Sequence, residues 1–130
     1  MELCVKNRRP LSGIHVMVVD DSNDARDVFK TVLSFLGALT TARPSAASAL
    51  SVLTLVTPDV IVTDLTMPGR DGYWLLEQVR ASGRGIPVLA VTADKYADLS
   101  AFDGGAYKPV DLEQLADLIL DAVVLRRKSP

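Results

Sequence analysis

Three acids and one lysine stand at the ends of apolar stretches in this sequence. Asp20 and Asp21 end one such run, Asp64 ends another, and Lys108 ends a third segment. Carboxylates crowded at one rim repel one another unless a cation neutralises them. Mg²⁺ suits such a rim, because it takes a few carboxylate oxygens and keeps several waters. A carboxylate beside such an ion can attack phosphorus and form an acyl phosphate. The pattern therefore predicts a divalent-metal site around a nucleophilic aspartate.

Each of these residues also has an ordinary explanation when it is taken alone. An acid ahead of a helix commonly caps it, and a lysine or a strand-end threonine is common at a protein surface. Capping explains the tandem pair Asp20 and Asp21 less well than it explains a single acid. Lys108 and the hydroxyl of Thr92 could both bind phosphoryl oxygens, since phosphoryl transfer mainly needs positioning and charge neutralisation. The prediction depends on the whole set rather than on any one member.

Strand-length apolar runs alternate with segments of helical periodicity along the chain. We expect strands at 14–19, 39–43, 59–63, 87–91 and 106–108. We expect helices after the capping residues Ser22 or Asn23, Ser45 and Asp111, and over 71–81. The first helix carries four apolar residues at helical spacing, Val28, Val32, Phe35 and Leu36. The strands are too apolar to expose either face to solvent, so the pattern predicts a parallel sheet with helices on both faces. Such sheets bind ligands at the carboxyl ends of their strands, where the acids and the lysine fall.

The composition fits one packed domain. The chain has 130 residues, a net charge of −2 and a hydrophobic fraction of 48%. We expect a lead-in at 1–12, the domain at 13–126 and a tail at 127–130. Basic residues gather in the two tails, and we interpret them as solvated ends rather than as a nucleic-acid site.

Cysteine content and hydropathy indicate in which cellular compartment the protein works. Cys4 is the only cysteine, which excludes a disulfide framework and fits a reducing environment. The chain has no apolar stretch of the ~18 residues that a membrane span needs, and no secretory signal. We therefore expect a cytoplasmic protein with no membrane partner.

The chain resembles the receiver domains of two-component response regulators and hybrid histidine kinases. The resemblance covers roughly residues 12–125. It is carried by Val18–Val19–Asp20–Asp21, by Asp64 with Met67–Pro68, by Asp71–Gly72, by Val91–Thr92–Ala93 and by Lys108–Pro109. The resemblance implies a flavodoxin-like, doubly wound sheet of five parallel strands in the order 2-1-3-4-5.

The resemblance also implies the roles of individual residues. Asp64 would accept a phosphoryl group from a histidine kinase or phosphotransfer protein. Lys108 would pair with that group, ahead of a cis bond to Pro109, and Thr92 would move toward it. Mg²⁺ would be held by Asp64, by Asp21 directly, by Asp20 largely through water and by the backbone carbonyl of Thr66.

The second half of the sequence departs from the family pattern. Lys108 follows Thr92 by only 16 positions, an interval about a turn and a half of helix shorter than in relatives. We expect the fourth helix of the family, between the last two strands, to be shortened or lost. Relatives carry an aromatic residue three positions before the lysine, where this chain has Gly105. Tyr107 is the candidate to replace it.

Three functions follow from these residues. The first is a phosphorylation-dependent switch that signals through contacts with a downstream protein and catalyses only its own phosphorylation and dephosphorylation. It would stand alone or form the receiver of a larger chain, without binding nucleic acid directly. The second is an adaptor that keeps the fold but not the phosphorylation. The third is a small aspartyl-phosphate phosphatase, which the presence of Thr66 instead of an acid two positions after Asp64 disfavours.

Overall fold

The computed structural model describes residues 9–128, and Cys4, Lys6 and Arg8 lie outside them. Its centre is a sheet of five parallel strands in the order β2-β1-β3-β4-β5. The strands are β1 (His15–Val19), β2 (Leu39–Arg43), β3 (Val60–Thr63), β4 (Val88–Thr92) and β5 (Gly104–Tyr107). The helices are α2 (Asn23–Phe35), α3 (Ala46–Val52), α4 (Gly72–Ala81) and α5 (Leu112–Lys128). The predicted fold class and strand order are confirmed.

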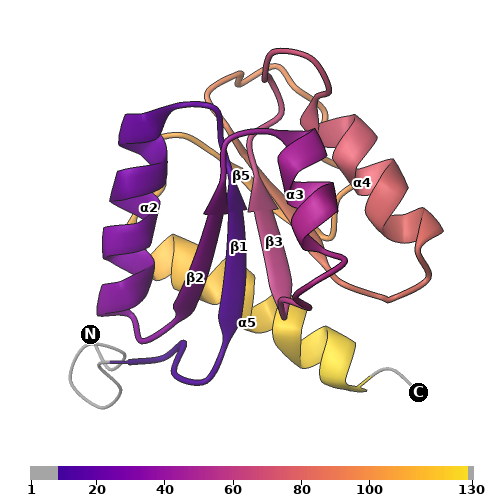
Figure 1. The fold of residues 1–130 in the computed structure, drawn as a ribbon. Coiled ribbons are helices and arrows are strands. Elements are labelled where there is room, and N and C mark those ends of the chain that lie inside the picture. Colours follow the sequence, from indigo (N-terminus) through magenta and orange to yellow (C-terminus); the bar gives the residue numbers. More distant parts are fainter. Residues whose placement is uncertain (1–8, 129–130) are drawn as a thin grey trace.

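The helices form a layer on each face of the sheet (Figure 1). Side chains of β1 alternate between the layers, because successive residues of a strand point to opposite faces. Val16 and Val18 pack with α2 and α5, whereas Met17 and Val19 pack with α3 and α4. Leu11 is fully buried in the first of these cores. Two hydrophobic cores, one on each face of the sheet, thus hold the strands in place.

Short polar side chains cap the helices at the positions predicted from the sequence. Ser22 caps α2, Ser45 caps α3 and Asp71 caps α4, each accepting a hydrogen bond from a backbone N–H three residues later. Asp111 accepts from the N–H of Gln114 (2.7 Å) at the start of α5. Such caps satisfy backbone donors that have no partner within the helix. Among the described helices, none has the length and apolar character to cross a membrane.

The buried side of α2 differs from the expected apolar set. Leu33 and Leu36 are buried, but Val28 and Phe35 are 61% and 67% exposed. The helix is therefore rotated relative to the expected apolar set, so that Leu33 rather than Val28 lies against the sheet.

The segment 93–103 between β4 and β5 contains no helix, so the predicted loss of the family's fourth helix is confirmed. The strand that follows begins two residues before the expected position. Gly105 explains part of this arrangement, because a Cβ there would lie 2.8 Å from Cδ1 of Leu99 and 3.0 Å from the carbonyl of Ala90. Leu99 thus occupies the space that a side chain at position 105 would need. The chain crosses between the two strands without a helix by packing Leu99 against β5.

Gly72 lets the start of α4 approach the end of β3. A Cβ at Gly72 would lie 2.5 Å from the backbone carbonyl of Asp64 and 3.1 Å from Cα of Leu65. The N–H of Gly72 also donates to the carbonyl of Leu65 (2.9 Å). Both obstacles are backbone atoms, so neither can turn aside as a side chain would. The position of Asp64 therefore depends on a residue with no side chain at 72.

Gly72→Ala should lower the free energy of unfolding by about 3 kcal/mol, the upper part of the range for overpacking, because rigid backbone must shift. Chemical denaturation of the purified variant measures this loss. Gly69→Ala is the matched control, since Gly69 has a φ of 82° but a Cβ added there would meet nothing within 4 Å. The control should lose only about 1 kcal/mol, the usual cost of a left-handed residue. Equal losses in the two variants would contradict the steric account.

Candidate functional site

The register of the central strands brings Asp20 and Asp64 to the same edge of the sheet. Val19 and Thr63 are neighbours in the β1–β3 ladder, and each aspartate is the next residue along its strand. The N–H of Asp64 donates to the carbonyl of Val19 (2.9 Å) and extends the ladder by one bond. The N–H of Asp20 donates to the carbonyl of Arg43 (3.2 Å) on the other side. Parallel pairing alone thus sets two carboxylates side by side.

Asp21 completes a group of three carboxylates. One oxygen from each of Asp20, Asp21 and Asp64 can be chosen so that all lie within 4.8 Å of one another. Asp20 is buried, Asp64 is partly buried and Asp21 is exposed. The group is therefore open to solvent on the side of Asp21. This is the oxygen donor set that a hard divalent cation such as Mg²⁺ prefers, with one side left for water.

Lys108 reaches this group from the end of β5. Thr92 and Tyr107 are neighbours in the β4–β5 ladder, and the N–H of Lys108 donates to the carbonyl of Thr92 (2.7 Å). The ammonium of Lys108 lies 3.0 Å from Oδ2 of Asp20 and 3.5 Å from Oδ2 of Asp64. The peptide bond between Lys108 and Pro109 is cis, as the family resemblance implies.

Two opposing effects act on the charge of Lys108. Burial opposes the charged form, but the hydrogen bond to Asp20 and the negative charge of Asp64 outweigh burial and raise the pKa above its usual value. The ammonium therefore stays protonated at neutral pH and would lose its charge only in strongly basic solution. One fixed positive charge thus stands against three carboxylates.

Backbone donors fix the orientation of the two inner carboxylates. Oδ1 of Asp20 accepts from the N–H of Ser22 (3.0 Å), and Oδ1 of Asp64 accepts from the N–H of Leu65 (2.7 Å). In both residues the other oxygen, Oδ2, is the one nearest to Lys108. The Asp64 side chain is 15% exposed, so solvent reaches the carboxylate.

Arg26 is a supporting residue that the sequence analysis missed. Its Nη1 donates to the backbone carbonyl of Asp20 (2.7 Å) and ties the start of α2 to the end of β1. Its position one turn into a helix that follows the acidic pair was the available signal. Arginine is common on helix surfaces, however, so its type alone could not reveal this contact.

The two threonines of the predicted set lie in different surroundings. Thr92 ends β4 and is buried, and its hydroxyl accepts from the N–H of Asp94 (3.1 Å). Thr66 is exposed, two residues after Asp64. Thr92 is thus the link between the ladder that places Lys108 and the segment that replaces the helix.

Two tyrosines hold the segment 93–103 in place. The hydroxyl of Tyr107 donates to the carbonyl of Ala97 (2.8 Å), and the hydroxyl of Tyr73 donates to the carbonyl of Asp98 (2.7 Å). The rings of Tyr73 and Phe102 also pack, with centroids 5.4 Å apart. Burial and the nearby carboxylate of Asp98 raise the pKa of Tyr73, so its hydroxyl keeps the proton that it donates. The segment is thus fastened to both α4 and β5.

Comparison with known proteins agrees with this geometry. An uncharacterised 14.6 kDa protein of Leptolyngbya boryana is 38% identical over 117 residues, which cover 84% of this chain and 89% of that protein. The DNA-binding transcriptional regulator NtrC of Escherichia coli is 36% identical over 114 residues, and the match covers 83% of this chain but only 24% of NtrC. The full-length FixJ structure from B. japonicum superposes with a TM-score of 0.82 at 26% identity, covering 90% of this chain and 61% of FixJ.

The profile of the response regulator receiver domain matches residues 16–120, which include every residue of the site described above. The chain therefore belongs to the response regulator receiver domain family.

Proposed function

We propose that Asp64 is the phosphoacceptor of this receiver domain, and that its phosphorylation alters contacts with a downstream protein. The observation that carries the proposal is the contact of Lys108 with both Asp20 and Asp64. A lysine that merely balanced surface charge would not need a strand register and a buried partner to hold it. Here the chain holds a positive charge beside the one inner carboxylate that remains partly open to solvent.

The geometry of Asp64 supports one course for phosphoryl transfer. Oδ1 is held by the N–H of Leu65, so Oδ2 is the oxygen that would attack phosphorus. A new bond joins Oδ2 to phosphorus, and the bond from phosphorus to the donor atom breaks, leaving its electron pair on the donor. Lys108 can then pair with a phosphoryl oxygen, because it already lies 3.5 Å from Oδ2.

Asp20, Asp21 and Asp64, with the backbone carbonyl of Thr66, would hold a Mg²⁺ ion. The three carboxylates fit the ion because their oxygens lie within 4.8 Å of one another and the group is open on one side. The bound ion would supply neutralisation of the negative charge on the phosphoryl oxygens. Asp21 would bind the ion directly, and Asp20 would bind it largely through water, since Oδ2 of Asp20 already pairs with Lys108.

The segment 93–103 is our candidate for the part that responds to phosphorylation. Thr92 lies between the site and this segment, and its hydroxyl would turn from the N–H of Asp94 toward a phosphoryl oxygen. That movement would release one of the bonds that hold the start of the segment. Order–disorder changes of this kind are a common output of phosphorylation switches.

The remaining features of the proposal concern partners and setting. We propose a sensor histidine kinase or phosphotransfer protein as the donor and a protein as the downstream partner, in the cytoplasm. We keep 13–126 as the extent of the receiver domain, with residues 1–12 and 127–130 flanking it. NtrC is named as DNA-binding, but this chain spans 24% of its length, and we propose no direct contact with nucleic acid.

Incubation with a small acyl phosphate donor in Mg²⁺ should add one phosphoryl group to the protein, because Asp64 is open and paired with Lys108. Intact-protein mass measures the adduct. Asp64→Asn should remain unmodified, and so should the wild type when the metal is chelated. Asp117→Asn, which removes an exposed acid of α5, is the matched control and should gain the adduct normally. Absence of an adduct in the folded wild type would favour the phosphorylation-independent adaptor.

Tyr107→Phe should loosen the segment 93–103 without changing phosphorylation of Asp64, since it removes only the hydroxyl bond to Ala97. Loss of one such bond should speed amide hydrogen exchange in this segment about fivefold. Tyr96→Phe is the matched control, because Tyr96 is 89% exposed in the same segment. Equal exchange rates in the two variants would show that the Tyr107 hydroxyl does not hold the segment.

A further inference from the structure

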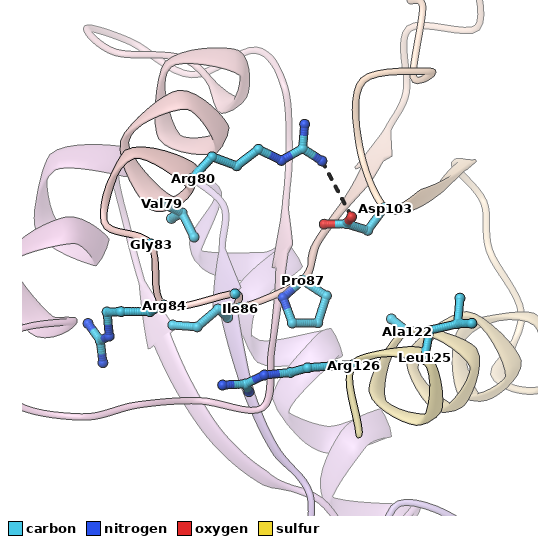
Figure 2. A pocket seen from close by; sticks show the side chains of 11 residues that line it. Val79, Arg80, Gly83, Arg84, Ile86, Pro87, Asp103, Ala122, Leu125 and Arg126 are labelled. Carbon is cyan, nitrogen blue, oxygen red and sulfur yellow. Dashed lines mark hydrogen bonds and ion pairs between the residues drawn. The ribbon is translucent and has the colours of Figure 1, made fainter. Parts of the chain in front are cut away.

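A cleft of about 740 Å³ lies at the amino ends of β4 and β5 (Figure 2). Asp64 follows the carboxyl end of the parallel strand β3, so the cleft and Asp64 lie at opposite ends of the strands. Its sides come from the ends of α4 and α5, and the residues just before β4 lie between them. The volume falls within the range of roughly 300–1,000 Å³ that is usual for small-molecule sites. Nothing in the proposed phosphorylation chemistry uses this part of the molecule.

Two arginines face this cleft from different helices. Arg80 comes from the last turn of α4 and Arg126 from the last turn of α5, with Ile86 and Pro87 between them. Arg84 also lines the cleft, but its guanidinium turns away and donates to the carbonyls of Leu53 (2.6 Å) and Val56 (3.4 Å) and to the hydroxyl of Thr57. The cleft is thus positively charged in a chain of net charge −2.

The contacts of Arg80 and Arg126 within the protein are long. Arg80 lies 3.4 Å from Asp103, and both side chains of this pair are well exposed. Arg126 lies 3.5 Å from each of the carbonyls of Pro58 and Asp59. A guanidinium carries five N–H donors in a planar fork, so donors remain for a ligand. Arginine forms its strongest such bonds with phosphate and carboxylate oxygens.

A cation in the last turn of a helix also has a general explanation, because it offsets the negative end of the helix dipole. That explanation accounts for the charge of Arg80 and of Arg126 taken separately. It does not account for their facing one cleft across an apolar surface. Arg127 is the useful contrast, since it shares the last turn of α5 but is exposed and does not line the cleft.

The apolar part of the cleft narrows the class of ligand. Ile86 and Pro87 lie between the two arginines, and Ala122 and Leu125 line the side formed by α5. A ligand that fits needs an anionic group for the arginines and an apolar part for this aliphatic wall. We propose that the cleft binds a nucleoside phosphate, with its phosphate between Arg80 and Arg126.

Asp103 would compete with the phosphate for Arg80. Its Oδ2 accepts from the N–H of Val88 (2.8 Å), while its Oδ1 is the oxygen that pairs with Arg80. Asp103→Asn can keep an oxygen for Val88 while losing the negative charge. This variant should therefore bind the ligand more tightly than the wild type.

Titration of the full chain with adenosine monophosphate tests the proposal, with the amide NMR signals of Val88 and Asp103 as the readout. We expect saturable shifts with a midpoint below about 1 mM. Arg80→Gln and Arg126→Gln should each weaken binding about tenfold, because each removes a charged hydrogen bond. Arg127→Gln should bind within about twofold of the wild type, and Asp103→Asn about threefold more tightly. An amide spectrum that matches the wild type shows that a variant is folded, and Arg80→Gln carries the test if Arg126→Gln does not fold.

Adenosine and inorganic phosphate separate the two halves of the proposed ligand, and each should bind more weakly than the nucleotide. Absence of saturable shifts would overturn the proposal, and so would equal weakening by Arg126→Gln and Arg127→Gln. Inorganic phosphate binding as tightly as the nucleotide would also overturn it, because the apolar wall would then play no part. Asp64→Asn should bind the nucleotide normally, so this test is independent of the proposed phosphorylation.

Discussion

Repulsion between carboxylates is the constraint on which the carboxyl edge of this sheet depends. At a separation of no more than 4.8 Å, two ionised groups such as Asp20 and Asp64 would repel by roughly 3 kcal/mol or more at an effective dielectric constant of about 20. The protein offsets this repulsion with the ammonium of Lys108 and with backbone N–H donors to one oxygen of each aspartate. These contacts leave excess negative charge on the side of Asp21, where a divalent cation would be most favourable.

The rest of the fold keeps that lysine in place. Lys108 follows β5, and β5 pairs with β4 through a register that ends at Thr92 and Tyr107. The crossover between these strands is short, and Leu99 packs into space that only a glycine at 105 leaves open. Tyr73 and Tyr107 then fasten the crossover through their hydroxyls. The shortened connection and the position of Lys108 therefore depend on the same packing contacts.

Much of this arrangement follows from the sequence, because parallel strands buried on both faces leave a plain signal. Mainly apolar runs predict β1 and β3, and the carboxyl ends of neighbouring parallel strands meet at one edge. The side of α2 that faces the core was harder to predict, since Phe35 and Leu33 are both apolar and only tertiary packing chooses between them. The start of β5 was also missed, because Gly104 and Gly105 have weak strand propensity and form a strand only through their pairing with Leu89 and Ala90 of β4. The contact of Arg26 with the carbonyl of Asp20 has no distinctive spacing, so only the structure reveals it.

The most direct measurement of the central claim is a Mg²⁺ titration followed through the amide NMR signals of Ser22 and Leu65, whose N–H groups donate to Asp20 and Asp64. Our account predicts saturable shifts of both signals at millimolar Mg²⁺. The affinity should fall by about tenfold in Asp21→Asn, which removes a charged ligand, and should stay unchanged in Asp24→Asn, which removes an exposed acid in the first turn of α2. Shifts that are absent, or that both variants weaken equally, would contradict a metal site formed by these three aspartates.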